Sequence, residues 1–405
     1  MAVTQHQYRQ WLDDLPLALE VVDLRNNQLR EIPQAILNPP GDQLLAIARI
    51  NSVTLIEGNP FPTGYWRTLE VYWRRVVADY PAMRTGPRAD AFRLDGDIPE
   101  VAMVRRMYPD KNPQAAREYL LALGDGAEEQ IARRIAGFEL LETQLQAYIA
   151  DSQPGPAQAM GPERVNATRL ARIIRGCWLG ESDGVLKLPP LYGPLPLLTV
   201  DFSHVKSLTL DSVIWSDTAN TLLSNCPNLE SLTIVNSGID KLPQKIAEMD
   251  KLNYLDLSSN QIKLDEQSAL ALGALHQLKQ IDLSNNQLRA VPDFSAMSGL
   301  QALNLKNTGL SQWPAGLLDK TALNHLDLRD NRLSEVPQAN FNPTPETLAV
   351  VARINNVTRL EGNDFPSVYW RKFDGYWRRL KESHPELMEP ALRRISLAAL
   401  EQALQ

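Results

Sequence analysis

Leu229-Glu-Ser-Leu232-Thr-Ile234 begins a run of five similar segments that decides how this chain folds. The other four are Leu252-Asn-Tyr-Leu255-Asp-Leu257, Leu278-Lys-Gln-Ile281-Asp-Leu283, Leu300-Gln-Ala-Leu303-Asn-Leu305 and Leu323-Asn-His-Leu326-Asp-Leu328. Successive segments start 22 to 26 residues apart. Apolar residues that recur at so regular a distance are typical of proteins in which one small unit is stacked many times.

The spacing within each segment predicts its structure. The first, fourth and sixth residues are apolar and should point into a shared core, while the residues between them face outward. One segment cannot bury its apolar face alone, so neighbouring segments must stack. An asparagine at the ninth position, present as Asn260, Asn286 and Asn331, is expected to satisfy the backbone groups of the turn. Ser237 and Thr308 take this position in the other two segments.

This is the leucine-rich-repeat pattern, L-x-x-L-x-L-x-x-N-x-L. We therefore expect an α/β fold, a leucine-rich-repeat solenoid with parallel strands on its concave face. Apolar-proline steps such as Leu242-Pro243 and Val291-Pro292 follow the turns. Because proline has no amide hydrogen, these steps should end strand pairing and start the return along the convex side.

The composition indicates a globular chain that carries more acid than base. Of its 405 residues 44% are apolar and 22% charged, and the formal net charge is −7. The acidic balance argues against nucleic acid and anionic membranes as partners, and no apolar run is long enough for a transmembrane helix. The only two cysteines, Cys177 and Cys226, fit a reducing compartment, and Cys226 is expected to be a buried structural thiol.

The beginning of the chain repeats its end. Leu19 to Arg75 aligns with Leu323 to Arg379 without a gap, and roughly half of the paired residues are identical. This internal duplication predicts the end of a first solenoid in residues 1–84 and a second, longer solenoid with the same ending in residues 191–388. Residues 85–190 are expected to form an α-helical connector with a Pro/Gly hinge near 153–162, and residues 389–405 a C-terminal helix.

The duplicated ending predicts a capping helix. The aromatic and apolar residues of each copy recur on one helical face, and they are Tyr65, Trp66, Leu69, Tyr72, Trp73 and Val76, then Tyr369, Trp370, Phe373, Tyr376, Trp377 and Leu380. A last repeat without a cap would expose core leucines and a strand edge. The alternative is that these aromatics and the flanking arginines bind a ligand such as single-stranded nucleic acid.

The concave face is the candidate functional site. Side chains of the third, fifth and seventh positions should leave the strands toward solvent in parallel columns, a surface suited to a protein or peptide. The candidate partner-binding residues are Tyr254, Asp256, Gln280, Asp282, Asn304, Lys306, His325, Asp327 and Arg329. Tyr254 is typical of an interface anchor, although polar residues in these columns could also serve only to keep the strands soluble.

No catalytic or metal-binding motif is present. The five histidines are scattered and neither cysteine lies at ligand spacing from them. Phosphate-binding, dinucleotide-binding and nucleophile-elbow patterns are also absent. We therefore predict no catalytic residues, no metal and no cofactor.

The repeats, the Leu-Pro steps and the closing Tyr-Trp-Arg-Arg helix resemble the leucine-rich regions of bacterial effector-like proteins that carry a novel E3 ligase domain. In that family the repeats select substrates and a cysteine in a Cys-x-Asp motif carries ubiquitin. Cys177 is followed by Trp178-Leu179 and Cys226 by Pro227-Asn228, so neither cysteine matches this motif.

Three functional hypotheses follow. The first is a non-enzymatic scaffold that binds another protein or peptide on its concave face, in the form of the recognition part of a secreted bacterial effector. The second is the substrate-recognition portion of an E3 ubiquitin ligase whose catalytic domain lies outside this chain. The third is an enzyme within the helical connector. Because no signal peptide is visible at the N-terminus, we expect the protein to be cytoplasmic or to be secreted by a route other than Sec.

Overall fold

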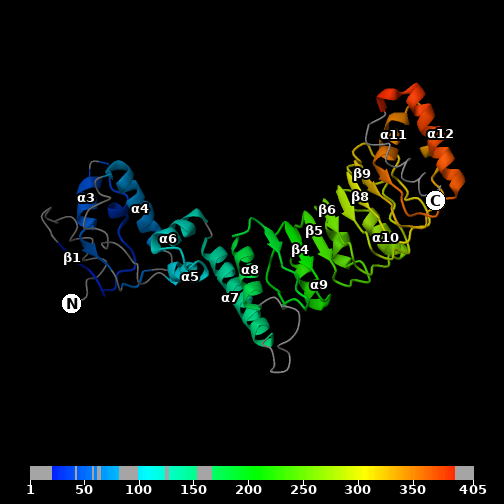
Figure 1. The fold of residues 1–405 in the computed structure, drawn as a ribbon. Helices are drawn as coiled ribbons and strands as arrows, with labels where there is room; N and C mark the ends of the chain where they lie inside the picture. The colour runs from blue at the N-terminus through cyan, green and yellow to red at the C-terminus, as the bar shows by residue number, and fades with distance from the viewer. Residues whose placement is uncertain are drawn as a thin grey trace. The chain divides into compact units, whose positions relative to one another are not determined.

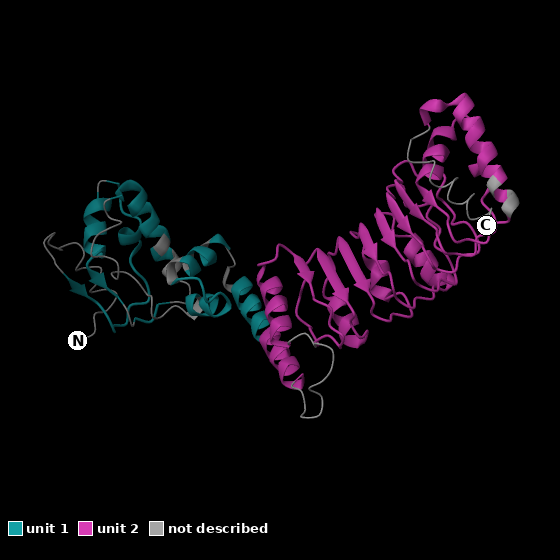
Figure 2. Cartoon of the chain, in the orientation of Figure 1, with its two compact units in different colours: residues 1–139 teal, residues 140–405 magenta. Residues whose placement is uncertain are grey.

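The computed structural model describes residues 21–41, 43–56, 59–61, 65–81, 99–123, 127–152 and 167–387. The chain forms two compact units, unit 1 with residues 1–139 and unit 2 with residues 140–405, shown in Figure 2. Three predicted features lie outside the described residues: the hinge near 153–162, the C-terminal helix 389–405 and the first leucine of the early repeat, Leu19.

Unit 2 is built around one parallel sheet of eight strands in the order β10-β9-β8-β7-β6-β5-β4-β3 (Figure 1). The strands are β3 (Val185–Lys187), β4 (Ser207–Asp211), β5 (Ser231–Val235), β6 (Tyr254–Asp256), β7 (Gln280–Asp282), β8 (Ala302–Asn304), β9 (His325–Asp327) and β10 (Thr358–Arg359). Strands β5 to β9 each begin at the third residue of one of the five predicted segments, and β4 begins at the third residue of an equivalent segment that starts at Val205. The predicted solenoid of parallel strands is therefore confirmed.

The strand register stacks the fourth residues of the repeats into one buried column. Leu208 pairs with Leu232, Leu232 with Leu255, Leu255 with Ile281 and Ile281 with Leu303. All five side chains are at most 2% exposed. Burying a leucine or isoleucine side chain stabilises a fold by roughly 1.5–3 kcal/mol, so the repeated column holds the sheet together.

The asparagine column satisfies the turn backbone as predicted. The Asn260 amide nitrogen donates to the carbonyls of Ile234 and Leu257, and its oxygen accepts the Ser237 amide at 3.0 Å. Each asparagine thus joins its own turn to the preceding one. In the two exceptional repeats hydroxyl groups take over part of this role, since Ser237 Oγ accepts the Val213 amide and Thr308 Oγ1 donates to the Leu305 carbonyl.

A second layer covers the other side of the sheet. It contains α9 (Asp217–Ser224), the 3-10 turn η3 (Gln244–Glu248) and α10 (Glu266–Gly273), in which η3 contacts both helices. Within unit 2 the strands line the inner side of the curve, and α9 and α10 lie on its outer side (Figure 1).

Both edges of the long sheet are covered. Helix α8 (Ala167–Leu179) packs against β3, and the Trp178 indole donates to the Asp201 carbonyl at 3.1 Å. The sheet begins at β3, whereas the sequence placed the start of the long solenoid at residue 191. The reason is that Pro189-Pro190 interrupts the repeat pattern directly after β3.

The far edge carries the predicted cap. After η4 (Gln338–Asn340), helix α11 (Leu348–Val357) fills the long interval before β10, and α12 (Ser367–Ser383) and η5 (Pro385–Leu387) close the solenoid. Phe373, Tyr376 and Leu380 are buried, as predicted. Trp377 is only half-buried, and the side chains of Trp66 and Trp370 lie outside the described part of the structure.

Unit 1 has the same closing segment followed by connector helices. Its elements are β1 (Val22–Asp23), α2 (Gln34–Leu37), α3 (Leu44–Asn51), β2 (Thr54–Leu55), α4 (Tyr65–Asp79), α5 (Pro99–Met107), α6 (Pro113–Ala122) and α7 (Ala127–Asp151), which continues into unit 2. β1 pairs with β2 in parallel, as β9 pairs with β10. Asn112 caps α6 by accepting the Ala115 amide at 2.8 Å, because the first amides of a helix lack partners within it.

Candidate functional site

The concave face is formed by the third and fifth residues of each repeat, which alternate with the buried fourth residue. In β6 the third and fifth residues are half-exposed and the fourth is buried, and β4 and β5 show the same alternation. The register places the predicted site residues Tyr254 and Gln280 side by side, and likewise Asp256 and Asp282. Gln280 and His325 are exposed, whereas Asn304 and Lys306 are half-exposed.

Asp256 and Asp282 form the electrostatic centre of this face. They lie on neighbouring strands, and Asp282 accepts the Asn304 side-chain amide at 2.7 Å. Burial, with a smaller contribution from the Asp282 charge, raises the pKa of Asp256. Burial and then the charges of Asp256 and Asp282 also raise the pKa of Tyr254. Negative charge therefore gathers around a half-buried tyrosine.

The fifth residues also shape the strands. Asp256 accepts the Ser258 amide and Asp282 the Ser284 amide, each at 2.9 Å. An aspartate that captures the amide two residues later makes a turn and removes that amide from the ladder. The strands that hold Asp256 and Asp282 end at these residues, whereas β4 and β5, which have threonine there, continue for two more residues. The carboxylates thus have a structural role besides their charge.

Asp327 differs from the expectation that it faces solvent. Its side chain is only 4% exposed and is held by Arg329, whose Nε donates to it at 2.9 Å. Burial alone would raise the pKa of Asp327, but the hydrogen bonds from Arg329 outweigh burial and hold this pKa below its ordinary value. Asp327 and Arg329 therefore neutralise each other. Lys306 is likewise engaged, at 3.3 Å from Asp330.

Arg359 belongs to the same face but lies outside the predicted site. It is exposed on β10 and pairs in register with Asp327. The insertion of α11 lengthens this repeat, so β10 does not follow the period of the other strands in the sequence. The internal duplication adds no signal here, because the aligned pair Thr54-Leu55 lies equally far from the repeat before it.

The described residues contain no cluster of metal-binding side chains and no helix both long and apolar enough to cross a bilayer. Cys177 and Cys226 are buried, and burial raises the pKa of Cys177 and raises that of Cys226 to about 12. Neither thiol is therefore suited to act as a thiolate nucleophile.

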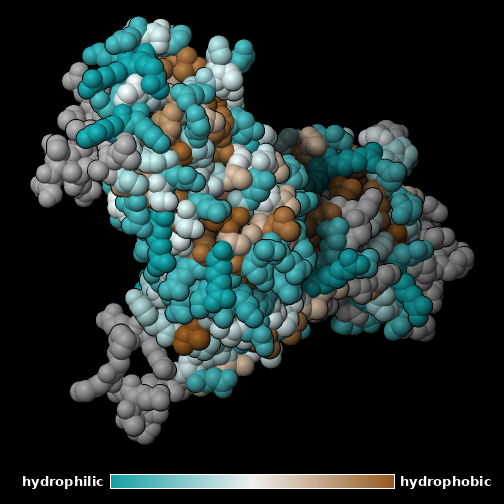
Figure 3. All heavy atoms as spheres, turned by 90° about the vertical axis from the view of Figure 1, so that its right-hand side faces the viewer, coloured by the Kyte–Doolittle hydropathy of each residue, from teal (hydrophilic) through white to brown (hydrophobic). Residues whose placement is uncertain are grey.

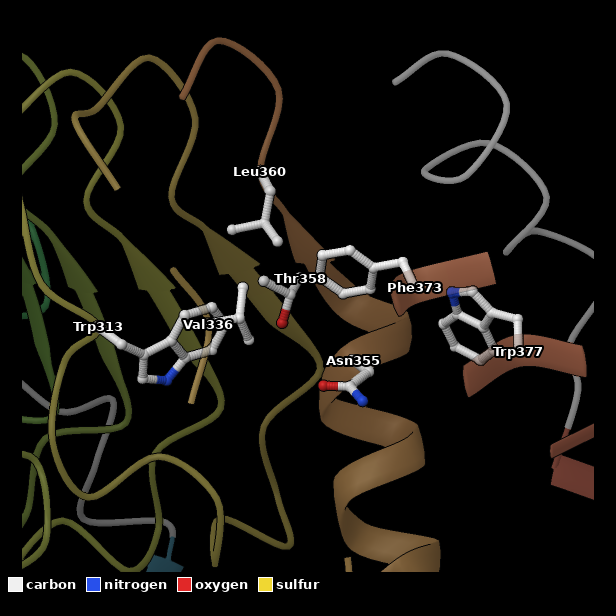
Figure 4. Close-up of a pocket in the computed structure, with 7 residues that line it drawn as sticks. All are labelled: Trp313, Val336, Asn355, Thr358, Leu360, Phe373 and Trp377. Atoms are coloured by element: carbon white, nitrogen blue, oxygen red, sulfur yellow. The ribbon is translucent and has the colours of Figure 1, made fainter. Parts of the chain in front are cut away.

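A small pocket lies between the last strands and the cap (Figure 4). It is lined by Trp313, Val336, Asn355, Thr358, Leu360, Phe373 and Trp377. Most of these side chains also belong to the core that joins α11 and α12 to the sheet, since Val336, Asn355, Thr358, Leu360 and Phe373 are buried. The pocket is therefore a part of the cap packing. On the face seen in Figure 3, hydrophilic residues predominate and hydrophobic residues lie in patches between them.

Comparisons with known proteins agree with this fold. Two family models described as leucine rich repeat match residues 204–227 and 227–288. The chain is 29% identical over 238 residues to monocyte differentiation antigen CD14 of Mus musculus, which covers 57% of this chain and 59% of that protein. It is 30% identical over 152 residues to Tsukushi of Mus musculus, which covers 36% of this chain and 43% of that protein.

The chain thus spans about half the length of the curated relatives it matches. Among solved structures, YopM from Yersinia enterocolitica WA-314 aligns at 22% sequence identity with a TM-score of 0.34, over 49% of this chain and 40% of that one. The family-model matches, the parallel ladder and its asparagine column together show that the long sheet is a leucine-rich-repeat solenoid.

Proposed function

We propose that this protein is a protein-binding scaffold and that its partner lies along the concave face of unit 2, centred on Tyr254, Asp256 and Asp282. Extended concave surfaces are the usual binding surfaces of repeat proteins. The observation that carries the proposal is the pair of adjacent carboxylates, Asp256 and Asp282, which has no basic partner within the described ranges.

The contrast with Asp327 supports this choice of centre. All three aspartates occupy the same column and accept the same type of backbone amide, yet only Asp327 is neutralised by an arginine. Like charges on neighbouring strands destabilise a sheet. A partner that places a lysine or arginine between Asp256 and Asp282 would remove this repulsion, and the Tyr254 ring could pack against its aliphatic stem or its charge.

The test is a triple variant with Tyr254→Ala, Asp256→Asn and Asp282→Asn. Asparagine keeps the oxygen that accepts the Ser258 or Ser284 amide but removes the charge, as Asn304 already shows in the same column. We expect partner proteins that bind the wild-type chain in quantitative affinity purification to be lost. Binding of each purified partner should then weaken by about tenfold or more, while the thermal midpoint stays the same or rises.

A charge-matched control removes two exposed carboxylates elsewhere, with Asp250→Asn and Glu266→Gln. It should bind as the wild type does. If the triple variant retains its partners at full affinity, the concave centre is not the binding site. If both variants lose them equally, overall charge rather than this site is responsible.

The narrower hypotheses, a secreted bacterial effector or the recognition portion of an E3 ubiquitin ligase, take second place in this proposal. They rest on the repeats and on the closing Tyr-Trp-Arg-Arg segment. The buried state of Cys177 and Cys226 supports a non-enzymatic role for this chain. A ubiquitin-discharge assay tests this, since ubiquitin transfer by the chain alone would contradict the scaffold.

A further inference from the structure

We propose that unit 2 has a second protein-binding surface, separate from the concave face, on the turns that follow β3 and β4. Tyr192 and Ile214 form its apolar centre, and its partner is a segment of another protein with a basic and an apolar face. This inference goes beyond the proposed function because it uses other residues on another side of the repeats.

Tyr192 occupies a backbone position that suits other residues better. It has a φ of 49°, the left-handed conformation, which bulky side chains rarely adopt. In the turns that follow β4 to β9 the non-glycine residues with a positive φ are Ser212, Asn236, Ser259, Asn285, Asn307 and Asp330, all small and polar. Tyr192 is nevertheless 59% exposed, so burial of its ring does not offset the backbone strain. Strained positions cluster at functional sites.

Ile214 shows the same contrast in the neighbouring column. It is the tenth residue of its repeat and is 57% exposed. The tenth residues of the next five repeats are Gly238, Gln261, Gln287, Gly309 and Arg332, and none of them has a large apolar side chain. Among the turns that follow β3 to β9, only those after β3 and β4 therefore expose a large apolar side chain, one in the left-handed position and one at the tenth residue of the repeat.

The backbone holds the two turns together. The Tyr192 amide donates to the Ser212 carbonyl at 2.7 Å, and the Ile214 amide donates to the Gly193 carbonyl at 2.9 Å. Gly193 and Val213 form a β-bridge that extends the pairing of β3 and β4 beyond the strands themselves. Tyr192 and Ile214 thus lie on adjacent, rigid turns, and the half-buried Trp215 follows directly. Tyrosine and tryptophan are enriched among residues that dominate binding energy.

The nearby charges indicate the partner. Asp211 precedes the turn, and its carboxylate accepts hydrogen bonds from Ser212 and Asn236 but none from a lysine or arginine that the structure describes. Asp217, at the start of α9, is exposed. A second copy of the chain in a two-fold contact would bring these carboxylates against their own copies, which disfavours self-association. A basic segment with an apolar face matches both the charge and the exposed side chains.

The structure suggests substitutions that leave the fold intact. Tyr192→Asn and Ile214→Gln install the residues that later turns use in the same columns, such as Asn236 and Gln261. Since asparagine favours the left-handed conformation, the double variant should unfold at the same denaturant concentration as the parent or a higher one. The probe is a short helical peptide of leucine and lysine with one apolar face, and its binding is followed by the NMR signal of the Ile214 methyl group and by calorimetry.

Both measurements are made in the background of the concave triple variant, so the acidic centre at Asp256 and Asp282 does not contribute. We expect the peptide to shift the Ile214 methyl signal and Tyr192→Asn alone to weaken its binding by about tenfold or more. Binding should also weaken as salt is added. A leucine–glutamate peptide should not bind, and Leu270→Gln, which removes another exposed apolar residue, should leave the affinity unchanged.

Three outcomes would overturn the proposal. The first is equal affinity of the parent and the Tyr192→Asn variant. The second is a concentration-dependent dimer that the Tyr192→Asn and Ile214→Gln pair abolishes, which would make a second copy the occupant. The third is an Ile214 methyl group already shielded from a soluble paramagnetic reagent in the free chain, which would show that another part of the same chain covers it. None of these outcomes affects the concave-face proposal.

Discussion

The closing segments of the two units share their backbone plan and differ in how much of it is buried. Leu29 donates its amide to Asn59 at 3.1 Å, and its counterpart Leu333 donates to Asn363 at 3.0 Å. Tyr65 and Tyr369 receive an amide in the same way, from Ile32 and Val336. Roughly half of the residues of the two copies are identical, and Asn59 and Tyr65 make the same hydrogen bonds as Asn363 and Tyr369. Other identical residues differ, since Asn51 donates to the Tyr72 hydroxyl whereas its counterpart Asn355 donates to the Asn340 carbonyl.

Burial separates the copies. The carboxylate of Asp327 is 4% exposed and that of Asp23 is 48% exposed, although each pairs with the arginine two residues later. Asn331 is buried while Asn27 is half-exposed. In unit 2, β8 lies beside β9, whereas no described strand lies on the corresponding side of β1. A residue at a given position of the repeat therefore contributes more to stability where a neighbouring repeat is stacked upon it and buries it.

The cores of the caps also diverge. In unit 2, Phe341 packs edge-on against Phe373 with ring centroids 4.8 Å apart. Leu37 and Leu69 hold the corresponding positions in unit 1 and are equally buried. An aromatic pair in one copy thus replaces an aliphatic pair in the other.

The largest effect is expected from truncating this pair. Phe373→Ala should lower the free energy of unfolding of unit 2 by about 3–5 kcal/mol, because a buried ring is replaced by a cavity. Leu69→Ala in unit 1 should cost about 2–4 kcal/mol. Hydrogen exchange of α11 and α12 or of α3 and α4 during urea unfolding reports each unit separately. Phe373→Leu, which recreates the unit 1 residue, is the control and should retain most of the stability.

If Phe373→Ala leaves the exchange of α11 and α12 unchanged, the aromatic cluster is not what fastens the cap. The sequence also placed Trp370 and Trp377 on this face of the helix. The structure moves the expected effect to Phe373 and Tyr376, because Trp377 is only half-buried.

An intermediate effect is expected from the asparagine column. The Asn331 amide donates to the carbonyls of Leu305 and Leu328 at 2.8 and 3.0 Å and accepts the amides of Thr308 and Leu310, both at 3.0 Å. Asn331→Ala leaves these buried groups without partners, so it should cost about 2–4 kcal/mol. Asn27→Ala should cost less than about 1 kcal/mol, because the half-exposed site admits water.

Unfolding in urea, followed in the same way for each unit, measures the difference. Equal losses for Asn331→Ala and Asn27→Ala would contradict the dependence on stacking. Asn331→Ser is a useful control, because Ser237 already accepts a backbone amide at this position of its repeat. The Asn331→Ser variant should therefore lose less stability than Asn331→Ala.

Much of this fold could be predicted from the sequence because its signals are local and repeated. The period of leucines predicted strands β5 to β9, the aromatic spacing predicted α12, and the self-alignment predicted that unit 1 copies the end of unit 2. The start of the sheet could not be predicted, because β3 is followed by two prolines that break the pattern. Nor could Arg359, since α11 separates its strand from the preceding repeat.

The candidate site was predicted less well than the fold. Position in the repeat correctly placed Tyr254, Asp256 and Asp282 on one face, because side chains alternate along a strand. It could not tell that Asp327 is neutralised and buried while Asp256 is not, since that depends on whether the residue two places later is an arginine or a serine and on how it folds back. The distinction between structural and available charge arises from contacts within each turn.

The smallest effect is expected from the paired aspartates. Asp327→Asn keeps the oxygen that accepts the Arg329 amide but weakens the pair with its guanidinium, so it should lower stability by about 1–2 kcal/mol at pH 7. Asp23→Asn should have no measurable effect. Although Arg25 lowers the pKa of Asp23 to about 2, both side chains are nearly half exposed, and water screens their attraction.

The pH dependence of stability distinguishes a contribution from the charge of Asp327 from a contribution of its shape alone. The pKa of Asp327 is held below its ordinary value of 3.8, so its contribution to stability is complete at pH values above that and is lost as the pH falls through the lowered pKa. The stability difference between wild type and Asp327→Asn should therefore be constant from pH 7 to about pH 5 and shrink below about pH 4. A difference that persists undiminished at the lowest pH at which the chain stays folded would mean that Asp327 acts through its shape. The burial imposed by β8 would then matter for packing and not for charge.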